Sequence, residues 1–276
     1  MLKNKYINIF ALCFSSLLAS IANAEPVRVI TTGDSFTTQF YKNLSPVFQQ
    51  MNFSAEVVNP EFGRLGSSNT ARGGITASIY SGHAKFENET HVNYASNVMA
   101  ANPDVIIYML GLNDLFWGTS EDNTNSNSRA AARYQSYTAE IETIFNQFAN
   151  YKNLNDKHPV VYIGSILPFD LARSSSNLHT NLNSGALERI QHWYNPWLRD
   201  QAKRNGFNYV DLWSDIQQVD GWQEKYLTPT DGIHLSADGV NWTATQFAQT
   251  IVPEPNIMVL LSGIGMFVFW RVKSRN

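Results

Sequence analysis

The sequence predicts an α/β fold built on a parallel sheet of five strands. Five apolar runs rich in β-branched residues recur at wide intervals, and segments with the apolar spacing of helices lie between them. Two of the runs, "DVIIYML" and "PVVYIGSIL", are almost continuously apolar, which is typical of strands that are buried on both faces. The alternation of strand and helix therefore favours a sheet covered by helices on both sides.

The elements follow from this pattern in chain order. The expected strands are Val27–Thr32, Ala55–Asn59, Asp104–Leu110, Pro159–Ile166 and Phe207–Leu212. The expected helices are Phe36–Met51 (which can bend at Pro46), Ser78–Met99, Ser128–Tyr151, Ala186–Arg204 and Ser236–Val252. Polar stretches at 119–128 and 173–185 are expected to be surface loops. Together these elements form one domain over residues 25–252.

The N-terminal segment 1–24 has the layout of a secretory signal peptide. Lys3 and Lys5 precede an apolar stretch, and the segment ends in Ala-Asn-Ala, so we expect cleavage before Glu25. Cys13 is the single cysteine of the chain and would be removed with the signal. The exported domain is therefore expected to have neither a disulfide nor a cysteine-ligated metal.

The C-terminal segment 253–276 is also set apart from the domain. Its Pro-Glu-Pro motif precedes an apolar run, Ile257–Trp270, and a basic end. The run spans only about 21 Å as a helix, while a membrane span needs about 20 residues, so a short or tilted anchor is one interpretation. The arrangement closely resembles the PEP-CTERM sorting tail. This resemblance implies a Gram-negative source, transient membrane association, processing by an exosortase-type transpeptidase, and a surface or secreted destination.

The charge of the expected domain argues against nucleic acid as a partner. Residues 25–252 contain 15 basic and 22 acidic side chains, a net charge of −7, and no basic run. The histidines other than His234 show no mutual i, i+4 pairing, so no metal site is predicted, and no motif calls for a cofactor. These histidines are His83, His91, His158, His179 and His192.

Four short stretches that carry polar residues or glycines lie near the expected ends of strands. They are Gly33-Asp34-Ser35, Gly73-Gly74, "GLND" at 111–114, and "TPTDGIHLSADG" at 228–239. Because the carboxyl ends of parallel strands converge on one edge of a sheet, we expect these stretches to meet there.

The stretches supply the parts of a serine hydrolase site. Ser35 needs a base to become a nucleophile, His234 can be that base, and Asp231 can orient the imidazole. The backbone N–H groups of Ser35 and Gly74 and the side-chain amide of Asn113 can form an oxyanion hole. Each feature alone also fits a turn or a helix cap; for example, Asn113 can cap a helix that begins at the next residue. Their conjunction at strand ends favours catalysis.

These blocks resemble those of the GDSL, or SGNH, hydrolase family: Ser35 in Gly-Asp-Ser, the glycine at 74, Asn113 in Gly-x-Asn-Asp, and Asp231-x-x-His234. The resemblance implies a flavodoxin-like three-layer α/β/α sandwich. It also implies a Ser35–His234–Asp231 triad, with Ser35, Gly74 and Asn113 as the oxyanion hole.

The chain departs from the family pattern at two places. Phe36 replaces the leucine of the family's name, and we expect it to pack rather than react. The second-block glycine is ambiguous among Gly66, Gly73 and Gly74, of which Gly74 is preferred because "GIT" fits the family's Gly-x-Thr spacing. Asp34 and Asp114 are expected to hold loops rather than transfer protons. An α/β-hydrolase is disfavoured because Ser35 does not lie in G-x-S-x-G.

The predicted function is hydrolysis of acyl esters by a secreted or surface enzyme. Small acyl esters, including O-acetyl groups on glycans, are the leading substrate class, and short-chain esterase or lipase activity falls within it. Phe116 and Trp117 are expected to line the cleft. Two alternatives remain: an acyltransferase that acts on extracellular polysaccharide, and a catalytically idle surface protein that binds glycan. The expected processing partners are signal peptidase and the exosortase-type enzyme.

Overall fold

The computed structural model describes residues 25–58, 70–85, 91–116, 127–176 and 184–252. The expected signal peptide at 1–24 and the expected sorting tail at 253–276 lie outside these ranges. No helix in the described part of the chain is both long enough and apolar enough to cross a membrane.

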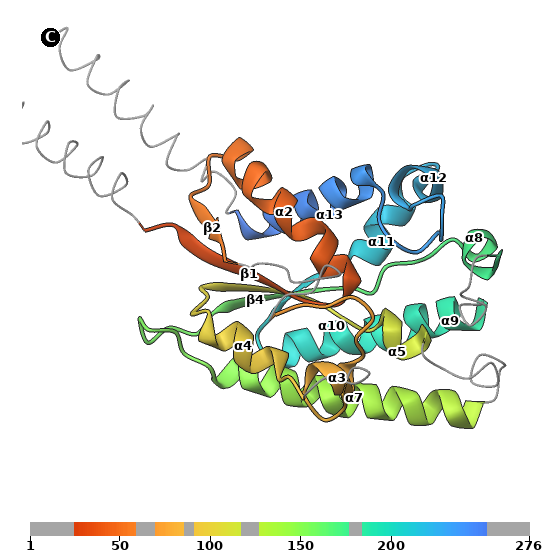
Figure 1. Ribbon diagram of the computed structural model, residues 1–276, viewed down its shortest axis with the longest axis horizontal. Helices are drawn as coiled ribbons and strands as arrows, with labels where there is room; N and C mark the ends of the chain where they lie inside the picture. The colour runs from red at the N-terminus through yellow and green to blue at the C-terminus, as the bar shows by residue number, and fades with distance from the viewer. Residues whose placement is uncertain (1–24, 59–69, 86–90, 117–126, 177–183, 253–276) are drawn as a thin grey trace, which may run out of the picture.

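A single sheet of five parallel strands forms the centre of the molecule, which confirms the predicted fold class (Figure 1). The strand order is β2-β1-β3-β4-β5, the order of flavodoxin-like folds. The strands are β1 (Val27–Gly33), β2 (Ala55–Val57), β3 (Val105–Met109), β4 (Val160–Gly164) and β5 (Asn208–Val210). Four of them lie within the predicted runs, and β1 extends one residue beyond its own.

The central strand β3 is buried on both faces of the sheet. All five of its residues are buried, and it pairs with β1 on one side and β4 on the other. The register sets Gly33 opposite Met109. The carboxyl ends of β1 and β3 are therefore level, and the segments that follow them emerge side by side.

One face of the sheet is covered by a layer that includes α2 (Ser35–Gln50), α11 (Leu212–Gln217), α12 (Trp222–Tyr226) and α13 (Ala237–Ile251) (Figure 1). Phe40 of α2 stacks on Phe247 of α13 with ring centroids 5.3 Å apart. The first and last long helices of the domain thus pack on each other over the sheet. Pro46 lies inside α2, as expected from the sequence.

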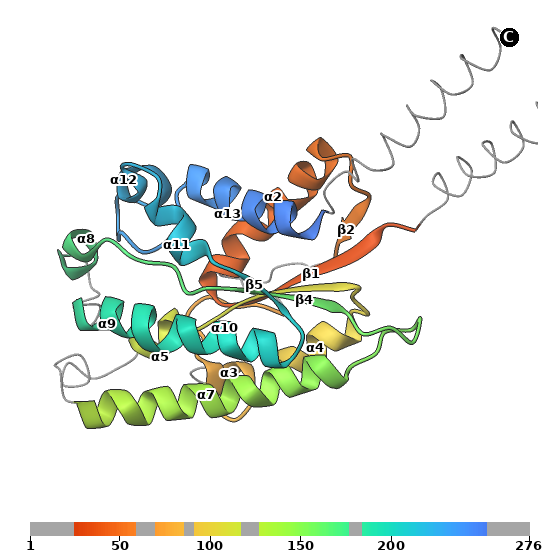
Figure 2. The same ribbon diagram turned by 180° about the vertical axis from the view of Figure 1, so that it is seen from behind.

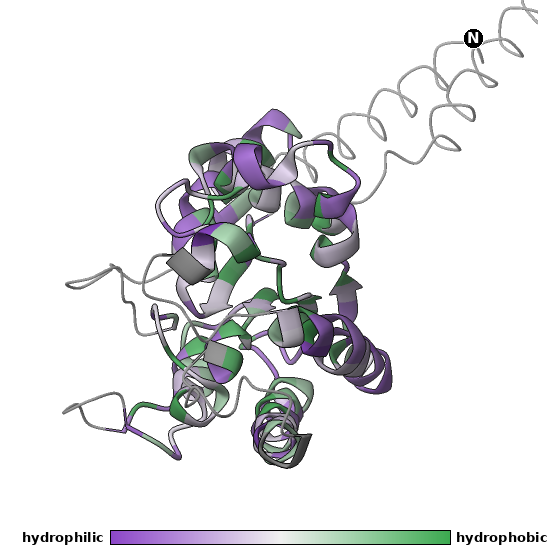
Figure 3. Cartoon of the chain, turned by 90° about the vertical axis from the view of Figure 1, so that its right-hand side faces the viewer, coloured by the Kyte–Doolittle hydropathy of each residue, from purple (hydrophilic) through white to green (hydrophobic). Residues whose placement is uncertain are grey.

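The opposite face is covered by α4 (Tyr94–Ala100), α7 (Asn127–Asn150) and α10 (Asn195–Arg204), among others (Figure 2). Tyr108 of β3 contacts Phe145 and Phe148 of α7 edge-on. The outer helices carry hydrophilic and hydrophobic positions side by side (Figure 3). The result is the three-layer sandwich that the resemblance implied.

The predicted helix Ser78–Met99 is wrong. The chain forms two short helices instead, α3 (Ala77–Tyr80) and α4. Gly82 follows α3 with φ +84°, and this left-handed conformation ends the helix. The apolar spacing continued past this glycine and masked the break.

The predicted helix Ala186–Arg204 is interrupted. It consists of α9 (Ser184–Arg189), a π-helical turn η1 (Ile190–Tyr194) and α10. Four further short helices in the described part of the chain were not predicted. They are α5 (Leu112–Phe116), α8 (Leu171–Ser176), which occupies part of the expected loop 173–185, α11 and α12.

Candidate active site

The turn between β1 and α2 presents Ser35 at the carboxyl edge of the sheet. Gly33 ends β1 with φ +137°, and a Cβ at this position would lie 1.7 Å from the carbonyl oxygen of Met109, so only glycine fits. Asp34 is the N-cap of α2 and accepts a hydrogen bond from the backbone N–H of Phe36 at 3.1 Å. Ser35 is therefore the first residue of a regular helix.

Ser35, His234 and Asp231 form a continuous hydrogen-bonded chain. Nε2 of His234 lies 3.2 Å from Oγ of Ser35, and Nδ1 lies 2.6 Å from Oδ2 of Asp231. In this arrangement the imidazole can take the hydroxyl proton while the carboxylate holds the Nδ1–H tautomer. The structure thus brings together the three residues that the sequence singled out as a triad.

The surroundings of Asp231 favour its charged form. Partial burial acts to raise its pKa, but hydrogen bonds from the His234 ring, the backbone N–H of Ile233 at 2.8 Å and the Thr228 hydroxyl at 2.7 Å outweigh burial. The net effect holds the pKa of Asp231 well below its ordinary value. The side chain can therefore stabilise an imidazolium on the neighbouring histidine.

The start of α8 braces the loop at 227–235, which carries His234. Gly232 has φ +65°, and a Cβ there would lie 2.7 Å from Cβ of Arg173. The carbonyl of Gly232 accepts a hydrogen bond from the backbone N–H of Asp170 at 2.7 Å. Asp170 in turn pairs with Arg173 at 3.2 Å. These contacts hold the loop against the start of α8.

Phe36 packs as expected from the sequence. Its side chain is buried, and its ring centroid lies 6.2 Å from that of His234 with the planes tilted by 34°. The aromatic ring therefore forms an apolar support beside the imidazole.

The three expected oxyanion donors lie on segments around the nucleophile turn. Gly73 lies against the nucleophile, because a Cβ there would be 3.6 Å from Cβ of Ser35, and Gly74 has φ +81°. Asn113 is the second residue of α5, so it does not cap a helix that begins after it. Gly66 lies outside the described residues. The assignment of Gly74 as a donor remains a prediction.

Two carboxyl groups link these segments, that of the buried Asp34 and that of the partly buried Asp114. Asp34 accepts a hydrogen bond from the backbone N–H of Gly111, which follows β3. Both carboxylate oxygens of Asp114 accept from the backbone N–H of Ala77, at 3.0 and 3.1 Å. Ala77 lies three residues after Gly74. Asp34 thus ties the serine turn to the asparagine segment, and Asp114 ties that segment to the glycine loop, in line with the expectation that both hold loops.

Burial dominates the protonation of these two groups. It raises the pKa of Asp34 to about 7 and that of Asp114 to about 8, despite the backbone hydrogen bonds that favour the charged forms. The charge of Asp34 also raises the pKa of Asp114. The hydrogen bonds of both carboxylates run to backbone N–H groups, at Phe36 and Gly111 for Asp34 and at Ala77 for Asp114, which fits a role in holding loops.

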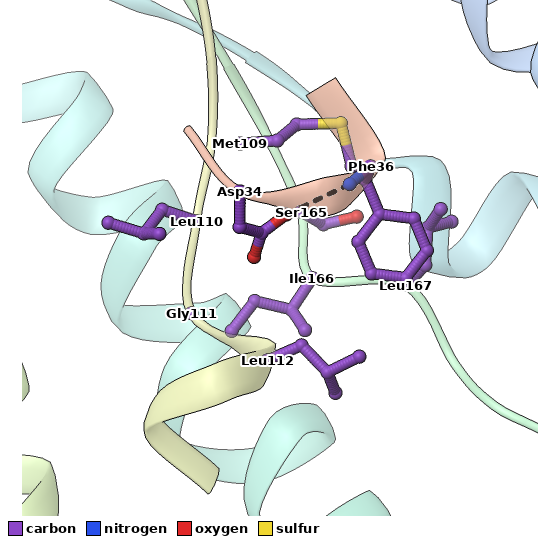
Figure 4. A pocket seen from close by; sticks show the side chains of 9 residues that line it. All are labelled: Asp34, Phe36, Met109, Leu110, Gly111, Leu112, Ser165, Ile166 and Leu167. Carbon is purple, nitrogen blue, oxygen red and sulfur yellow. Dashed lines mark hydrogen bonds between the residues drawn. The ribbon is translucent and has the colours of Figure 1, made fainter. Parts of the chain in front are cut away.

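A small, largely apolar hollow lies beneath the serine turn (Figure 4). Ile166, on the segment after β4, forms part of its wall, and its Cδ1 lies close to Gly111. The side chain of Asn195 clamps Ile166 from α10, with Oδ1 accepting from the backbone N–H at 2.8 Å and Nδ2 donating to the carbonyl at 3.0 Å. The residues that line the hollow are Asp34, Phe36, Met109, Leu110, Gly111, Leu112, Ser165, Ile166 and Leu167.

Several supporting residues were not found from the sequence. Thr228 donates to Asp231, and Asp170 and Arg173 brace the histidine loop. Gln39 accepts a hydrogen bond from the backbone N–H of Leu235. Only Gln39 had a usable signal, since it follows the serine by one helical turn. The side chain of Phe116 and the whole of Trp117 lie outside the described residues, so their place in the cleft remains a prediction.

Comparisons with known proteins identify the family and the fold of the chain. A family model described as the GDSL-like lipase/acylhydrolase family matches residues 31–242. No match was found among curated proteins. Solved structures that share the fold at low sequence identity include the following three.

A lipase/acylhydrolase from Enterococcus faecalis has a TM-score of 0.52 at 14% identity, covering 83% of this chain and 99% of its own. An aryl esterase from M. smegmatis has a TM-score of 0.51 at 15% identity, with coverages of 82% and 98%. A carbohydrate acetylesterase from Sinorhizobium meliloti has a TM-score of 0.51 at 13% identity, also with coverages of 82% and 98%. At these identities the likeness establishes the fold.

Proposed function

Because the chain belongs to the GDSL-like lipase/acylhydrolase family and is therefore an ester-hydrolysing enzyme, we propose that it is an exported serine esterase that acts through Ser35, His234 and Asp231. The observation that carries the proposal is the unbroken chain of contacts from the Ser35 hydroxyl to the Asp231 carboxylate, at 3.2 and 2.6 Å.

In the first half of the reaction, Oγ of Ser35 attacks the ester carbonyl carbon while His234 takes its proton. The resulting tetrahedral intermediate collapses, the ester C–O bond breaks, and His234 returns the proton to the departing alcohol. The lowered pKa of Asp231 keeps a negative charge beside the imidazolium throughout this step. The product is an acyl group on Ser35.

In the second half, water attacks the acyl-enzyme with His234 again acting as the base. The Ser35–acyl bond breaks, the free acid leaves, and the serine recovers its proton. Negative charge develops on the former carbonyl oxygen in both halves. The backbone N–H groups of Ser35 and Gly74 and the side chain of Asn113 are the donors proposed to stabilise it.

We propose small acyl esters as substrates, with O-acetyl groups on extracellular glycans as the leading case. The net negative charge of residues 25–252 disfavours strongly anionic polymers. A carbohydrate acetylesterase and an aryl esterase share this fold. Their activities support small acyl esters as the substrate class but do not distinguish one ester from another. The sorting-tail resemblance at 253–276 supports a polysaccharide-rich surface as the place of action.

Export is part of the proposal. The segment 1–24 would direct secretion, and 253–276 would hold the protein at the membrane until an exosortase-type enzyme processes it. Detection of the protein in cell-surface or medium fractions, with an N-terminus at Glu25, is the expected result. Retention in the cytoplasm with residue 1 intact would contradict it.

The activity is tested by labelling and turnover together. The purified protein and its Ser35→Ala variant are treated with a fluorophosphonate probe and assayed on p-nitrophenyl acetate and longer esters. Labelling confined to Ser35, with turnover lost in the variant, is expected. Ester turnover that survives Ser35→Ala, or a folded wild type with neither adduct nor turnover, would refute the proposed function.

A further inference from the structure

We propose that Gln39 is a positioning residue for His234, holding the histidine-bearing loop against the nucleophile helix. The inference rests on the proposed function, because it assigns a further residue to the same site. It does not depend on the identity of the ester.

The contact joins two segments that are far apart in the chain. The backbone N–H of Leu235 donates to Oε1 of Gln39 at 3.2 Å, across 196 residues of sequence. Gln39 follows Ser35 by four residues on α2, so both side chains lie on one face of the helix, one turn apart. His234 and Leu235 are consecutive. The loop therefore contacts the same helix face at two neighbouring points.

The first point is the catalytic contact between His234 and Ser35, and the second is the Gln39 contact. Leu235 is buried, with 4% of its surface exposed. A buried backbone N–H needs an acceptor, because water cannot readily take its place. Gln39 supplies that acceptor, so the second attachment persists when the imidazole moves its proton.

The loop is stiff enough to transmit this restraint. Oδ1 of Asp231 accepts from the Thr228 hydroxyl and from the backbone N–H groups of Ile233 and His234. The loop thus moves as a unit, and fixing the Leu235 N–H on α2 fixes the imidazole beside the serine. A shift of about 1 Å would break a contact that is already 3.2 Å long.

The main test compares Gln39→Leu with Gln50→Leu, which alters an exposed glutamine at the far end of the same helix. On p-nitrophenyl acetate we expect kcat of Gln39→Leu to fall about 10- to 100-fold, with KM within about twofold, since substrate contacts are unchanged. Gln50→Leu should match the wild type. A kcat for Gln39→Leu within twofold of the wild type, or an equal loss in Gln50→Leu, would overturn the proposal.

Two further variants separate positioning from general damage. Gln39→Glu keeps an acceptor oxygen at the same reach and should restore most of kcat. Gln39→Asn keeps an amide, but its side chain is one methylene too short to reach the Leu235 N–H. Its kcat should fall as much as is expected for Gln39→Leu, and this comparison remains available even if the leucine variant folds poorly. Full activity in Gln39→Asn would contradict the proposal, as would a loss in Gln39→Glu equal to that in Gln39→Leu.

A spectroscopic readout distinguishes failure of this inference from failure of the proposed function. NMR of the His234 ring nitrogens reports its contact with Ser35 whether or not an ester is turned over. Gln39→Leu should shift the Nε2 signal toward that of Ser35→Ala, and Gln50→Leu should not. A Nε2 signal unmoved by Gln39→Leu would reject the positioning role, even in a protein that hydrolyses esters.

Discussion

The buried carboxyl group of Asp34 should make the stability of the protein depend on pH in an unusual direction. Burial raises its pKa to about 7 in the folded state, whereas the unfolded chain keeps a value of about 3.9. Between these values the folded state holds a proton that the unfolded state has lost. Because the folded state then binds more protons, the free energy of unfolding must fall as the pH rises.

The size of this effect follows from the two pKa values. Asp34 lowers the free energy of unfolding by about 4 kcal/mol at pH 7 relative to strongly acidic solution, and about 2 kcal/mol of that loss falls between pH 5 and pH 7. Asp231 adds no slope in this window. Its pKa is lowered, so its stabilising contribution is complete above pH 5 and is lost only in acid.

The perturbation is Asp34→Asn, which keeps a neutral side chain with one acceptor oxygen for the start of α2. Urea unfolding followed by tryptophan fluorescence at pH 5, 6 and 7 gives the free energy of unfolding of variant and wild type. From pH 5 to pH 7, the free energy of unfolding of the variant minus that of the wild type should increase by about 2 kcal/mol. Asp220→Asn, at an exposed position, controls for the loss of one surface charge.

A difference that stays constant within about 0.5 kcal/mol over this range would contradict the raised pKa of Asp34. It would mean that Asp34 has the same proton affinity in the folded and unfolded chains. The same shift in Asp220→Asn would assign the effect to net charge instead.

Three other predictions concern the site, and the second of them has a control elsewhere in the chain. Asp231→Asn should lower kcat about 10⁴-fold with little change in KM, because the wrong histidine tautomer is held; a loss below tenfold in steady-state assays would argue against the triad. Gly33→Ala should lower the free energy of unfolding by more than about 4 kcal/mol, since its Cβ would collide with the carbonyl oxygen of Met109 in β3. Gly206→Ala, in open space at φ +71°, should lower it by only about 1–2 kcal/mol in the same melts. Asp114→Ala should leave the Ala77 N–H unpaired and lower stability by about 1–3 kcal/mol, with kcat reduced as the glycine loop loosens; equal melting and turnover of Asp114→Ala and wild type would contradict this role.

The strands were predictable because their signal is local. A strand buried on both faces must be apolar along its whole length, and the runs around Val105–Met109 and Val160–Gly164 stand out for that reason. The long amphipathic helix at Asn127–Asn150 was predicted within one residue at each end for a similar reason. Short helices such as α8 and α12 have too few residues to show the helical spacing of apolar residues.

The errors arose where a backbone conformation outweighed the apolar pattern. The break at Gly82 depends on a left-handed turn, and spacing alone does not reveal it. The π-helical turn at Ile190–Tyr194 does not end the helix, so the apolar spacing runs through it. The turn nevertheless shifts the face of the helix on which the later residues lie. Asn195, directly after this turn, reaches the backbone of Ile166 beneath the serine turn, a contact that no local rule could indicate.

The fold class and the candidates Ser35, Asp231 and His234 could be predicted from the sequence alone, because strand periodicity and short motifs are properties of neighbouring residues. How these residues are held depends on the folded chain. The contact between Gln39 and Leu235 spans 196 residues, and the bond from Ala77 to Asp114 joins two separate loops. Such contacts depend on where the packed sheet and helices bring distant segments together, and that placement is set by the whole core rather than by any stretch of sequence.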